Sequence, residues 1–245
     1  MRSVAMKIFQ KGFNYSQDGQ GNRLVYHLLG CNMRCPWCSN PEGLSVDGEH
    51  FFEMTPQEIL TEAVSSRPMF FDGGGATFTG GECTLQAIEL LQVLKMLKEN
   101  GIDTCIETNG TSDKLLEISK LLDRVIIDLK HPDSEKLREM TGVGNENTKR
   151  NIREIAKSGK DLLLRVPLIG GFNTDAEAVE GFKEFFCEIN RPNVRIELLK
   201  YHEYGKDKWE KLGWKYTVKN AFVTEEQRCE IEKVFKNSGL NTVRT

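Results

Sequence analysis

The fold and the chemistry of this chain centre on the stretch LVYHLLGCNMRCPWC, residues 24–38. Residues 24–29 form an apolar run that predicts a strand, and this strand leads directly into Cys31, Cys35 and Cys38. A structural zinc ion or a complete ferredoxin cluster takes four protein ligands, and no fourth cysteine follows at close spacing. Three thiolates can hold three corners of a four-iron four-sulfur cluster and leave one iron open, as reactive metal sites do. The alternatives are a structural zinc ion with a distant fourth ligand and three unrelated buried thiols.

Length, charge and hydropathy limit the classes of protein to which the chain can belong. Its 245 residues suit a single domain, residues 1–245. The net charge is −3 and the basic residues are spread along the sequence, which argues against a nucleic-acid partner. No run approaches the roughly 18 apolar residues of a membrane span, and residues 1–7 lack the apolar core of a signal peptide. We therefore expect a cytoplasmic protein with no membrane partner.

Strand-like runs alternate with amphipathic helices along most of the chain. Capping boxes mark the start of two helices, at residues 55–58 and 224–227. The runs expected to form strands are residues 24–29, 76–78, 103–107, 125–130, 162–169 and 194–199. Six strands separated by helices predict parallel βαβ units with right-handed crossovers.

Polar and glycine-rich residues gather after these strands, as at residues 80–82 and 108–110. Both an open doubly wound sheet and a barrel fit the order of the elements. Many strands that end at one site are typical of a barrel, but six units are too few for a ring of eight. We expect an α/β fold of the incomplete (β/α)6 TIM-like barrel type, built from parallel strands.

The motif Thr79-Gly80-Gly81-Glu82 lies between a predicted strand and a predicted helix. Glycines there allow the backbone to approach a ligand closely, and the carboxylate of Glu82 can bind an ammonium group. The motif is not a phosphate-binding loop, because no Gly-Lys-Ser/Thr follows. The alternative is a simple turn between strand and helix.

Charged side chains also end two later strands. Asp128 and Lys130 project to the same face, because side chains alternate along a strand. They form either a local ion pair or a clamp in which the compact charge of Lys130 binds a carboxylate. His202 follows the sixth strand and is either a core histidine or part of a site.

The cysteine spacing and the later Gly-Gly-Glu motif resemble those of the radical S-adenosylmethionine enzymes. Further segments resemble the activating enzymes of glycyl radical enzymes, above all those of pyruvate formate-lyase, and together they cover nearly the whole chain. These segments are residues 18–23, 73–82, 103–110, 128–130 and 197–213. Many relatives carry a cysteine-rich, ferredoxin-like insertion after the first motif. Residues 39–55 contain no cysteine, so we expect no such insertion.

The resemblance implies two cofactors and a set of residues for each. One 4Fe-4S cluster would be held by Cys31, Cys35 and Cys38. S-adenosylmethionine would bind the open iron and contact Trp37, Ser39, Gly80, Gly81, Glu82, Asp128, Leu129, Lys130, Arg165 and His202. A monovalent cation would be held by Glu107, Thr108 and Asp128. Glu107 is one methylene longer than the relatives' aspartate, so it could instead fill the space of the cation itself.

The resemblance also implies a reaction on a protein partner. An electron from flavodoxin or ferredoxin would cleave S-adenosylmethionine, and the 5′-deoxyadenosyl radical would take hydrogen from a backbone glycine of a glycyl radical enzyme. The partner's glycine loop is expected to bind at Asp18, Gly19, Gly21 and Arg23, where Gln20 and Asn22 replace the family's proline and isoleucine. We expect a monomer.

Three other functions remain open at this point. The chain could be a radical enzyme that modifies another peptide or a small molecule. It could also be a non-catalytic iron–sulfur module or a zinc-binding module. The sequence names neither the partner enzyme nor the electron donor.

Overall fold

The computed structural model describes residues 5–45 and 51–244. The chain forms two compact units. The first comprises Met1–Asn32, Asn40–Thr108 and Ser112–Ile126, and the second comprises Met33–Ser39, Asn109–Thr111 and Ile127–Thr245. Each unit is therefore built from segments that are distant in sequence, and the single domain over residues 1–245 stays a prediction.

The strands of the first unit are mostly those expected from the sequence. They are β1 (Met6–Tyr15), β2 (Asn22–Leu28), β3 (Phe52–Met54), β4 (Gly75–Gly80) and β5 (Thr104–Thr108), in the order β3-β1-β2-β4-β5. β2, β4 and β5 are parallel, as predicted, whereas β1 runs antiparallel to both β2 and β3. β1 and β3 were not predicted. The sequence of β1 has no continuous apolar run to indicate a strand, and Met6 and Ile8 are its only buried side chains.

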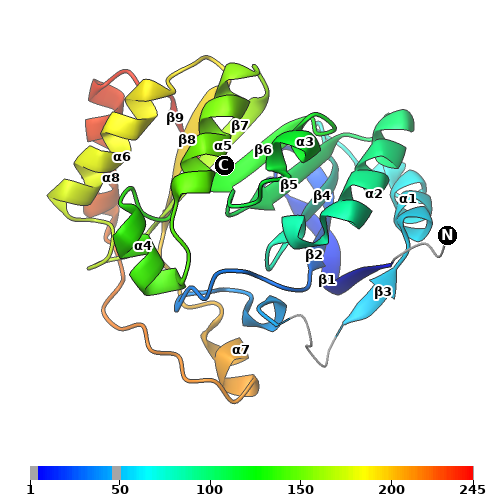
Figure 1. Ribbon diagram of the computed structural model, residues 1–245, viewed down its shortest axis with the longest axis horizontal. Helices are drawn as coiled ribbons and strands as arrows, with labels where there is room; N and C mark the ends of the chain where they lie inside the picture. The colour runs from blue at the N-terminus through cyan, green and yellow to red at the C-terminus, as the bar shows by residue number, and fades with distance from the viewer. Residues whose placement is uncertain (1–4, 46–50, 245) are drawn as a thin grey trace. The chain divides into compact units, whose positions relative to one another are not determined.

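Three α-helices belong to the first unit: α1 (Pro56–Ser65), α2 (Ala87–Glu99) and α3 (Leu115–Ser119). α1 begins at the predicted capping box, in which Thr55 and Glu58 each accept the other's backbone N–H. α1 and α2 lie side by side (Figure 1). Short 3₁₀ helices occupy the connections, namely η1 (Pro41–Gly43), η2 (Arg67–Met69) and η3 (Cys83–Gln86).

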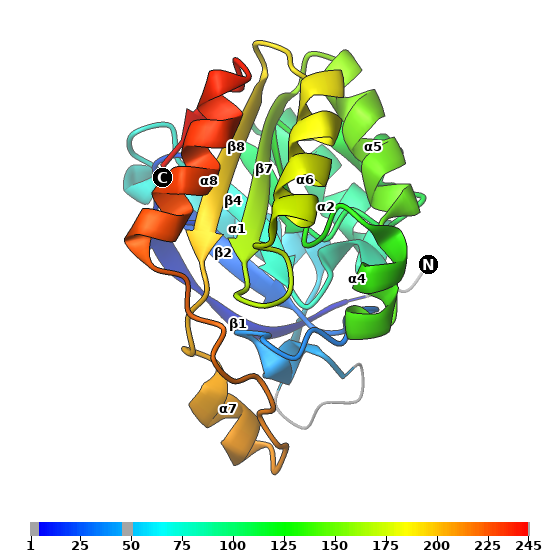
Figure 2. The same ribbon diagram turned by 90° about the vertical axis from the view of Figure 1, so that its left-hand side faces the viewer.

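β6 (Arg124–Asp128) runs from the first unit into the second, where β7 (Asp161–Leu168), β8 (Val194–Lys200) and β9 (Thr242–Val243) follow it in order. The helices of this unit are α4 (Ser134–Thr141), α5 (Glu146–Lys157), α6 (Ala176–Glu188), α7 (Lys206–Lys211) and α8 (Glu225–Asn237). α6 and α8 lie over the face of β7 and β8 (Figure 2). Phe186 of α6 and Phe235 of α8 meet edge to face, with 5.5 Å between their ring centroids.

The order of the parallel strands confirms the predicted fold class. β2, β4, β5, β6, β7 and β8 follow one another in chain order, and helices occur between them. This is a mixed α/β fold with a mostly parallel sheet, and it has the connectivity of an incomplete (β/α)6 barrel.

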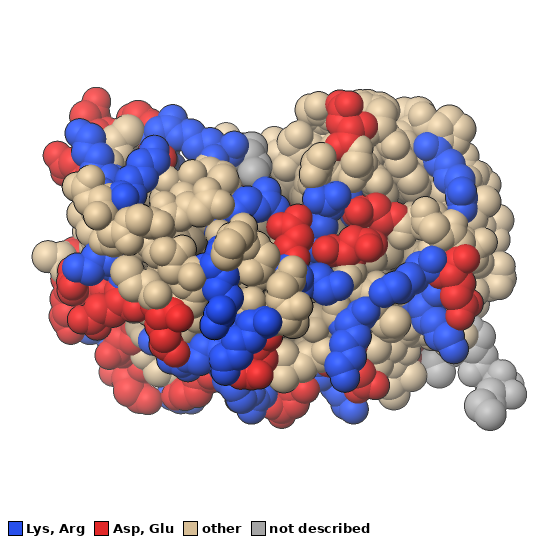
Figure 3. Space-filling view, turned by 90° about the horizontal axis from the view of Figure 1, so that it is seen from above, with Lys and Arg blue, Asp and Glu red and all other residues tan. Residues whose placement is uncertain are grey.

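The surface carries charges of both signs. On the face seen in Figure 3, lysines and arginines are interspersed with aspartates and glutamates. Among the residues that the structure describes, no helix has the length and apolar character needed to cross a membrane.

Candidate functional site

Cys31 belongs to the first unit, and the loop that carries Cys35 and Cys38 belongs to the second. Cys35 is buried, and Cys38 is half-buried. The N–H of Cys38 donates to the carbonyl oxygen of Cys35 at 3.1 Å, which closes a tight turn. The N–H of Arg34 donates to the carbonyl oxygen of Thr141 at 2.8 Å, at the last residue of α4. The loop is therefore fixed from within and by a neighbouring helix.

The chemistry of these thiols fits a metal cluster. Burial raises the pKa of the Cys35 thiol to about 12, while the charge of Lys130 acts in the opposite direction. A thiol in such surroundings is protonated in the protein alone, but a metal binds it as the thiolate and reverses that preference. No three His, Cys, Asp or Glu side chains of the described residues are grouped as ligands of a single metal ion. The fit of this loop to a metal cluster therefore rests on its thiol donors and on the turn closed by the hydrogen bond from Cys38 to Cys35.

Trp37, between these two cysteines, lies against a fixed aromatic neighbour. Its ring centroid is 5.0 Å from that of Phe172, which is in turn 4.8 Å from that of His131. Nδ1 of His131 accepts the N–H of Asp133 at 2.9 Å, so Nε2 carries the proton and donates to the carbonyl oxygen of Phe172 at 3.1 Å. Burial lowers the pKa of His131, which keeps this neutral form. The sequence analysis did not identify either His131 or Phe172.

The predicted Gly-Gly-Glu motif belongs to the first unit and runs beside the strand that leads to Cys31. The N–H of Gly81 donates to the carbonyl oxygen of Leu28 at 2.9 Å. The N–H of Glu82 donates to the carbonyl oxygen of Gly30 at 2.7 Å. Gly80 has a φ of 119°, and a Cβ there would lie 2.3 Å from the nitrogen of Leu28. A Cβ on Gly81 would lie 2.2 Å from the carbonyl oxygen of Gly30. Both glycines are required because two backbone segments meet without space for a side chain.

The side chain of Glu82 makes local contacts at the start of η3. Its side chain is buried, and its Oε1 caps η3 by accepting the N–H of Thr84 at 3.1 Å. The same oxygen accepts the hydroxyls of Thr84 and Thr108, at 2.5 and 2.6 Å. Glu107, one residue before Thr108, accepts the Thr79 hydroxyl at 3.4 Å. Binding of S-adenosylmethionine by Glu82, and of a cation by Glu107 and Thr108, stays a prediction.

In the second unit, Asp128 and Lys130 form an ion pair, one of the two arrangements that their common face allowed. Nζ of Lys130 lies 2.6 Å from Oδ2 of Asp128, and both side chains remain partly exposed. Leu129 between them is buried, and its N–H donates to the carbonyl oxygen of Arg165 at 2.9 Å. Nδ2 of Asn173, a residue that the sequence analysis missed, donates to the carbonyl oxygen of Lys130 at 2.8 Å. The end of this strand is therefore held at both its side chains and its backbone.

The other two predicted residues of the second unit differ in accessibility. Arg165 on β7 is buried, and its Nε donates to Glu197 on β8 at 2.9 Å. His202 is half-buried and stacks on Tyr204, with 4.1 Å between the ring centroids. Burial lowers the pKa of His202, which favours its neutral form.

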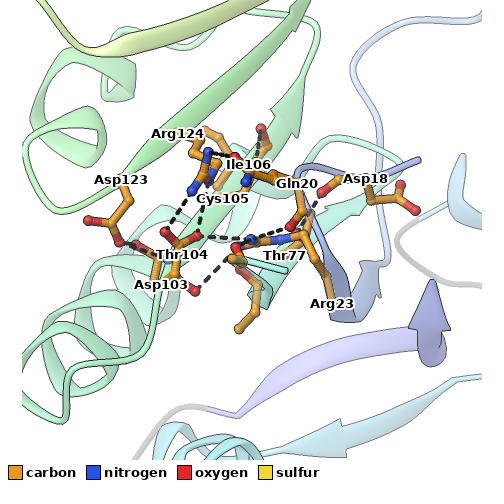
Figure 4. Close-up of polar contacts among 12 residues, drawn as sticks. Asp18, Gln20, Arg23, Thr77, Asp103, Thr104, Cys105, Ile106, Asp123 and Arg124 are labelled. Atoms are coloured by element: carbon orange, nitrogen blue, oxygen red, sulfur yellow. Dashed lines mark hydrogen bonds and ion pairs between the residues drawn. The ribbon is translucent and has the colours of Figure 1, made fainter. Parts of the chain in front are cut away.

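Arg23 is the centre of a polar network in the first unit (Figure 4). Its side chain is fully buried; Nε donates to the Thr77 hydroxyl at 2.6 Å, and Nη1 donates to Asp103 at 2.9 Å. Arg124 also pairs with Asp103, at 3.3 Å, and donates to the side-chain oxygen of Gln20 at 2.9 Å. Its guanidinium therefore supports the loop from inside, and the role of Arg23 in binding a partner's glycine loop stays a prediction.

The remaining residues of the predicted partner-binding loop differ in exposure. Gly21 and Asn22 are buried, and Nδ2 of Asn22 donates to the carbonyl oxygen of Met69 at 2.8 Å. Asp18 and Gly19 are half-buried, and Gln20 is exposed. Contact with a partner through these exposed and half-buried residues stays a prediction.

Comparison with known proteins agrees with these features. Residues 25–185 match the family model of the Radical SAM superfamily. The pyruvate formate-lyase-activating enzyme of Clostridium pasteurianum is 33% identical over 223 residues, which cover 89% of this chain and 92% of the relative. A crystal structure of a domain of the pyruvate-formate lyase-activating enzyme from Bacteroides vulgatus ATCC 8482 is 28% identical, with a TM-score of 0.58 over 70% of this chain and 98% of that one. A radical SAM methyltransferase from Sphaerobacter thermophilus shares the fold, with 13% identity and a TM-score of 0.64 over 94% of this chain and 67% of that one.

Proposed function

Because the chain belongs to the Radical SAM superfamily and, within it, to the family of the pyruvate formate-lyase-activating enzymes, we propose that it activates a cognate glycyl radical enzyme, pyruvate formate-lyase or a relative. The observation that carries this proposal is the extent of the similarity, which spans most of this chain and of the Clostridium pasteurianum relative. A match confined to a cofactor-binding core would support only a radical SAM enzyme of unspecified substrate.

Membership of the superfamily implies a 4Fe-4S cluster and S-adenosylmethionine. We propose that Cys31, Cys35 and Cys38 hold this one cluster. When bound and reduced by one electron from the donor, the two groups would supply a 5′-deoxyadenosyl radical, with release of methionine, for hydrogen abstraction from a glycine of the partner. The chain's own share is to present thiolates from a closed loop and to keep water from the reacting atoms. The burial of Cys35 and the anchoring of the loop at Thr141 support this role.

The cofactor's methionine end carries both an ammonium and a carboxylate, so it needs an anion and a cation from the protein. Lys130 supplies the cation, and Asp128 at 2.6 Å orients it. Glu82 would supply the anion, and Gly80 and Gly81, which place this turn against the backbone of Leu28 and Gly30, would be the adjacent contacts. The remaining proposed contacts are those of Trp37 and Ser39 with the adenine, together with those of Leu129, Arg165 and His202.

Several finer parts of the proposal concern partners. The electron donor would be flavodoxin or ferredoxin, and the protein would act as a cytoplasmic monomer without nucleic-acid or membrane partners. A monovalent cation beside the cofactor carboxylate would be held by oxygens of Glu107, Thr108 and Asp128, since hard cations prefer such ligands. Activity that is indifferent to replacing potassium with a bulky organic cation would remove this cation from the proposal.

The experiment that tests the function starts from protein reconstituted anaerobically with iron and sulfide. With reductant and S-adenosylmethionine, it should release 5′-deoxyadenosine and methionine and produce a glycyl radical signal in a peptide that copies the partner's glycine loop. Cys38→Ala should abolish both, whereas Cys187→Ala, at an exposed cysteine outside the loop, should not. Zinc in place of iron would contradict a cluster-based reaction. Cleavage without a signal in any candidate peptide or partner enzyme would leave a radical SAM enzyme with another substrate.

A further inference from the structure

The side chain of Trp209, on helix α7, reaches the loop that carries the clustered cysteines. Its indole N–H donates to the carbonyl oxygen of Cys38 at 2.9 Å, across 171 positions of the sequence. Both residues lie in the second unit. All six residues of α7 are described and none is buried. Burial of apolar side chains therefore does not explain where this helix packs.

Gly205, immediately before α7, contacts the same peptide group. A Cβ on Gly205 would lie 2.4 Å from the carbonyl oxygen of Cys38 and 2.8 Å from Cα of Ser39. Its φ of −81° and ψ of −14° suit any residue, so the backbone conformation does not require glycine. The close approach to the peptide between Cys38 and Ser39 requires it instead.

The indole of Trp209 is itself held in place by other aromatic rings. Its ring meets those of Trp214 and Tyr216 edge to face, at centroid distances of 5.8 and 5.9 Å. The Tyr216 hydroxyl lies 2.7 Å from that of Tyr201, which is buried and directly follows β8. These contacts restrict the rotation of the indole, so its N–H is a fixed donor rather than one of many surface orientations.

We propose that Trp209 is a positioning residue for the iron–sulfur cluster. It fixes the peptide between Cys38 and Ser39, and Cys38 carries the third thiolate of the cluster. This inference rests on the proposed function. The N–H of Cys38 donates to Cys35 and its carbonyl accepts from Trp209, so the residue is held on both sides of its Cα. Groups that orient a metal ligand in this way govern how firmly the metal is held and the potential at which it is reduced.

The test compares two Trp→Phe exchanges in reconstituted protein. Trp209→Phe keeps an aromatic ring against Trp214 and Tyr216 but removes the N–H donor. Trp214→Phe makes the same change in a tryptophan that touches Trp209 and is 38% exposed. The readouts are the rate of iron loss to a chelator and the electron spin resonance spectrum of the reduced cluster, with and without S-adenosylmethionine.

We expect Trp209→Phe to lose iron about fivefold faster than the parent, which corresponds to a net hydrogen bond of about 1 kcal/mol. Its reduced-state spectrum should also shift, whereas Trp214→Phe should match the parent in both readouts. A Trp209→Phe protein that matches the parent in both would overturn the inference. A parent that takes up no cluster at all would instead overturn the proposed function.

A second variant covers the case in which Trp209→Phe does not fold. Gly205→Ala pushes on the same Cys38–Ser39 peptide from the backbone side and should accelerate iron loss in the same way. Its control is Gly12→Ala, where the added methyl group meets no atom within 4 Å. Unchanged iron loss in Gly205→Ala would show that the position of this peptide does not govern retention of the cluster.

Discussion

Arg165 on β7 and Glu197 on β8 stand opposite each other in the parallel register and form an ion pair of 2.9 Å, with side chains only 6% and 4% exposed. The resemblance to the radical S-adenosylmethionine enzymes implied Arg165 as a cofactor contact, and the structure adds a buried partner on the next strand. Glu197 therefore orients the guanidinium of Arg165 before any cofactor binds.

Removal of one partner of this pair should destabilise the protein strongly. Glu197→Ala leaves the buried charge of Arg165 without its carboxylate, which should lower the free energy of unfolding by about 3–5 kcal/mol. The double variant Arg165→Met, Glu197→Leu removes both charges and should lose less. Urea unfolding of the cluster-free protein measures both. A double variant as unstable as the single one would show that the loss comes from packing rather than from the uncompensated charge.

Lys130→Met should weaken the binding of S-adenosylmethionine by one to two decades. A lost charge-assisted hydrogen bond costs about 1.5–3 kcal/mol, and titration calorimetry on the anaerobic, cluster-loaded protein resolves such a change. The matched control is Lys136→Met, since Lys136 also pairs with a carboxylate, that of Glu177, but on the surface. Unchanged affinity in Lys130→Met would remove this lysine from the cofactor site. Glu82→Gln is a less direct test because Glu82 also caps η3.

The buried His131 should make the protein less stable in acid. Burial lowers its pKa below the ordinary value of 6.5. Below pH 6.5 the unfolded chain binds a proton that the folded protein does not, so stability falls as the pH falls, by at most about 1.4 kcal/mol per pH unit. Well above pH 6.5 the residue is neutral in both states and contributes no pH dependence.

Unfolding measured between pH 7 and pH 5.5 tests this assignment. His131→Gln should flatten the fall in stability over that range. The pKa of His202 is also lowered by burial, so His202→Gln serves as the parallel measurement that separates the two contributions. An unchanged slope in the His131 variant would assign the acid sensitivity to other groups.

Partner choice should depend on Gln20 rather than on Asn22. Asn22→Ile would leave the carbonyl oxygen of Met69 without the amide that now donates to it, at a cost of about 1–3 kcal/mol. Gln20 is exposed, so Gln20→Ala removes a surface group and its contact with Arg124 at little cost to the fold. We expect Gln20→Ala to change which glycine-loop peptides acquire a radical while the melting temperature stays within a few degrees of the parent's. Unaltered peptide preference would assign selectivity to another surface.

The sequence predicted the parallel strands well, because runs such as residues 125–127 are apolar throughout and buried on both faces. It did not predict β1, whose middle and end are mostly exposed and carry no periodic pattern. The motifs located the cysteine loop and the turn at Gly80 and Gly81, since short-range spacing determines both.

Long-range contacts within the second unit could not be predicted in the same way. His131 reaches Phe172 across 41 positions, and Trp209 reaches Cys38 across 171. In both pairs a side chain bonds to a backbone carbonyl, and a carbonyl is the same group in every residue. The identity of the accepting residue therefore leaves no trace in the sequence, and only the folded chain brings the partners together.

The hydrogen bond from Trp209 to Cys38 also sets an order of events during synthesis. Cys38 leaves the ribosome 171 residues ahead of its donor, and at about 5–20 residues per second the cysteine loop exists for roughly 10–30 s before α7 is made. Throughout that interval the thiols are open to oxidants and to stray metals. Stable loading of the cluster is thus expected on the finished chain rather than on the nascent one. Ribosome-bound chains that end before residue 209 should release iron to a chelator faster than the completed protein does.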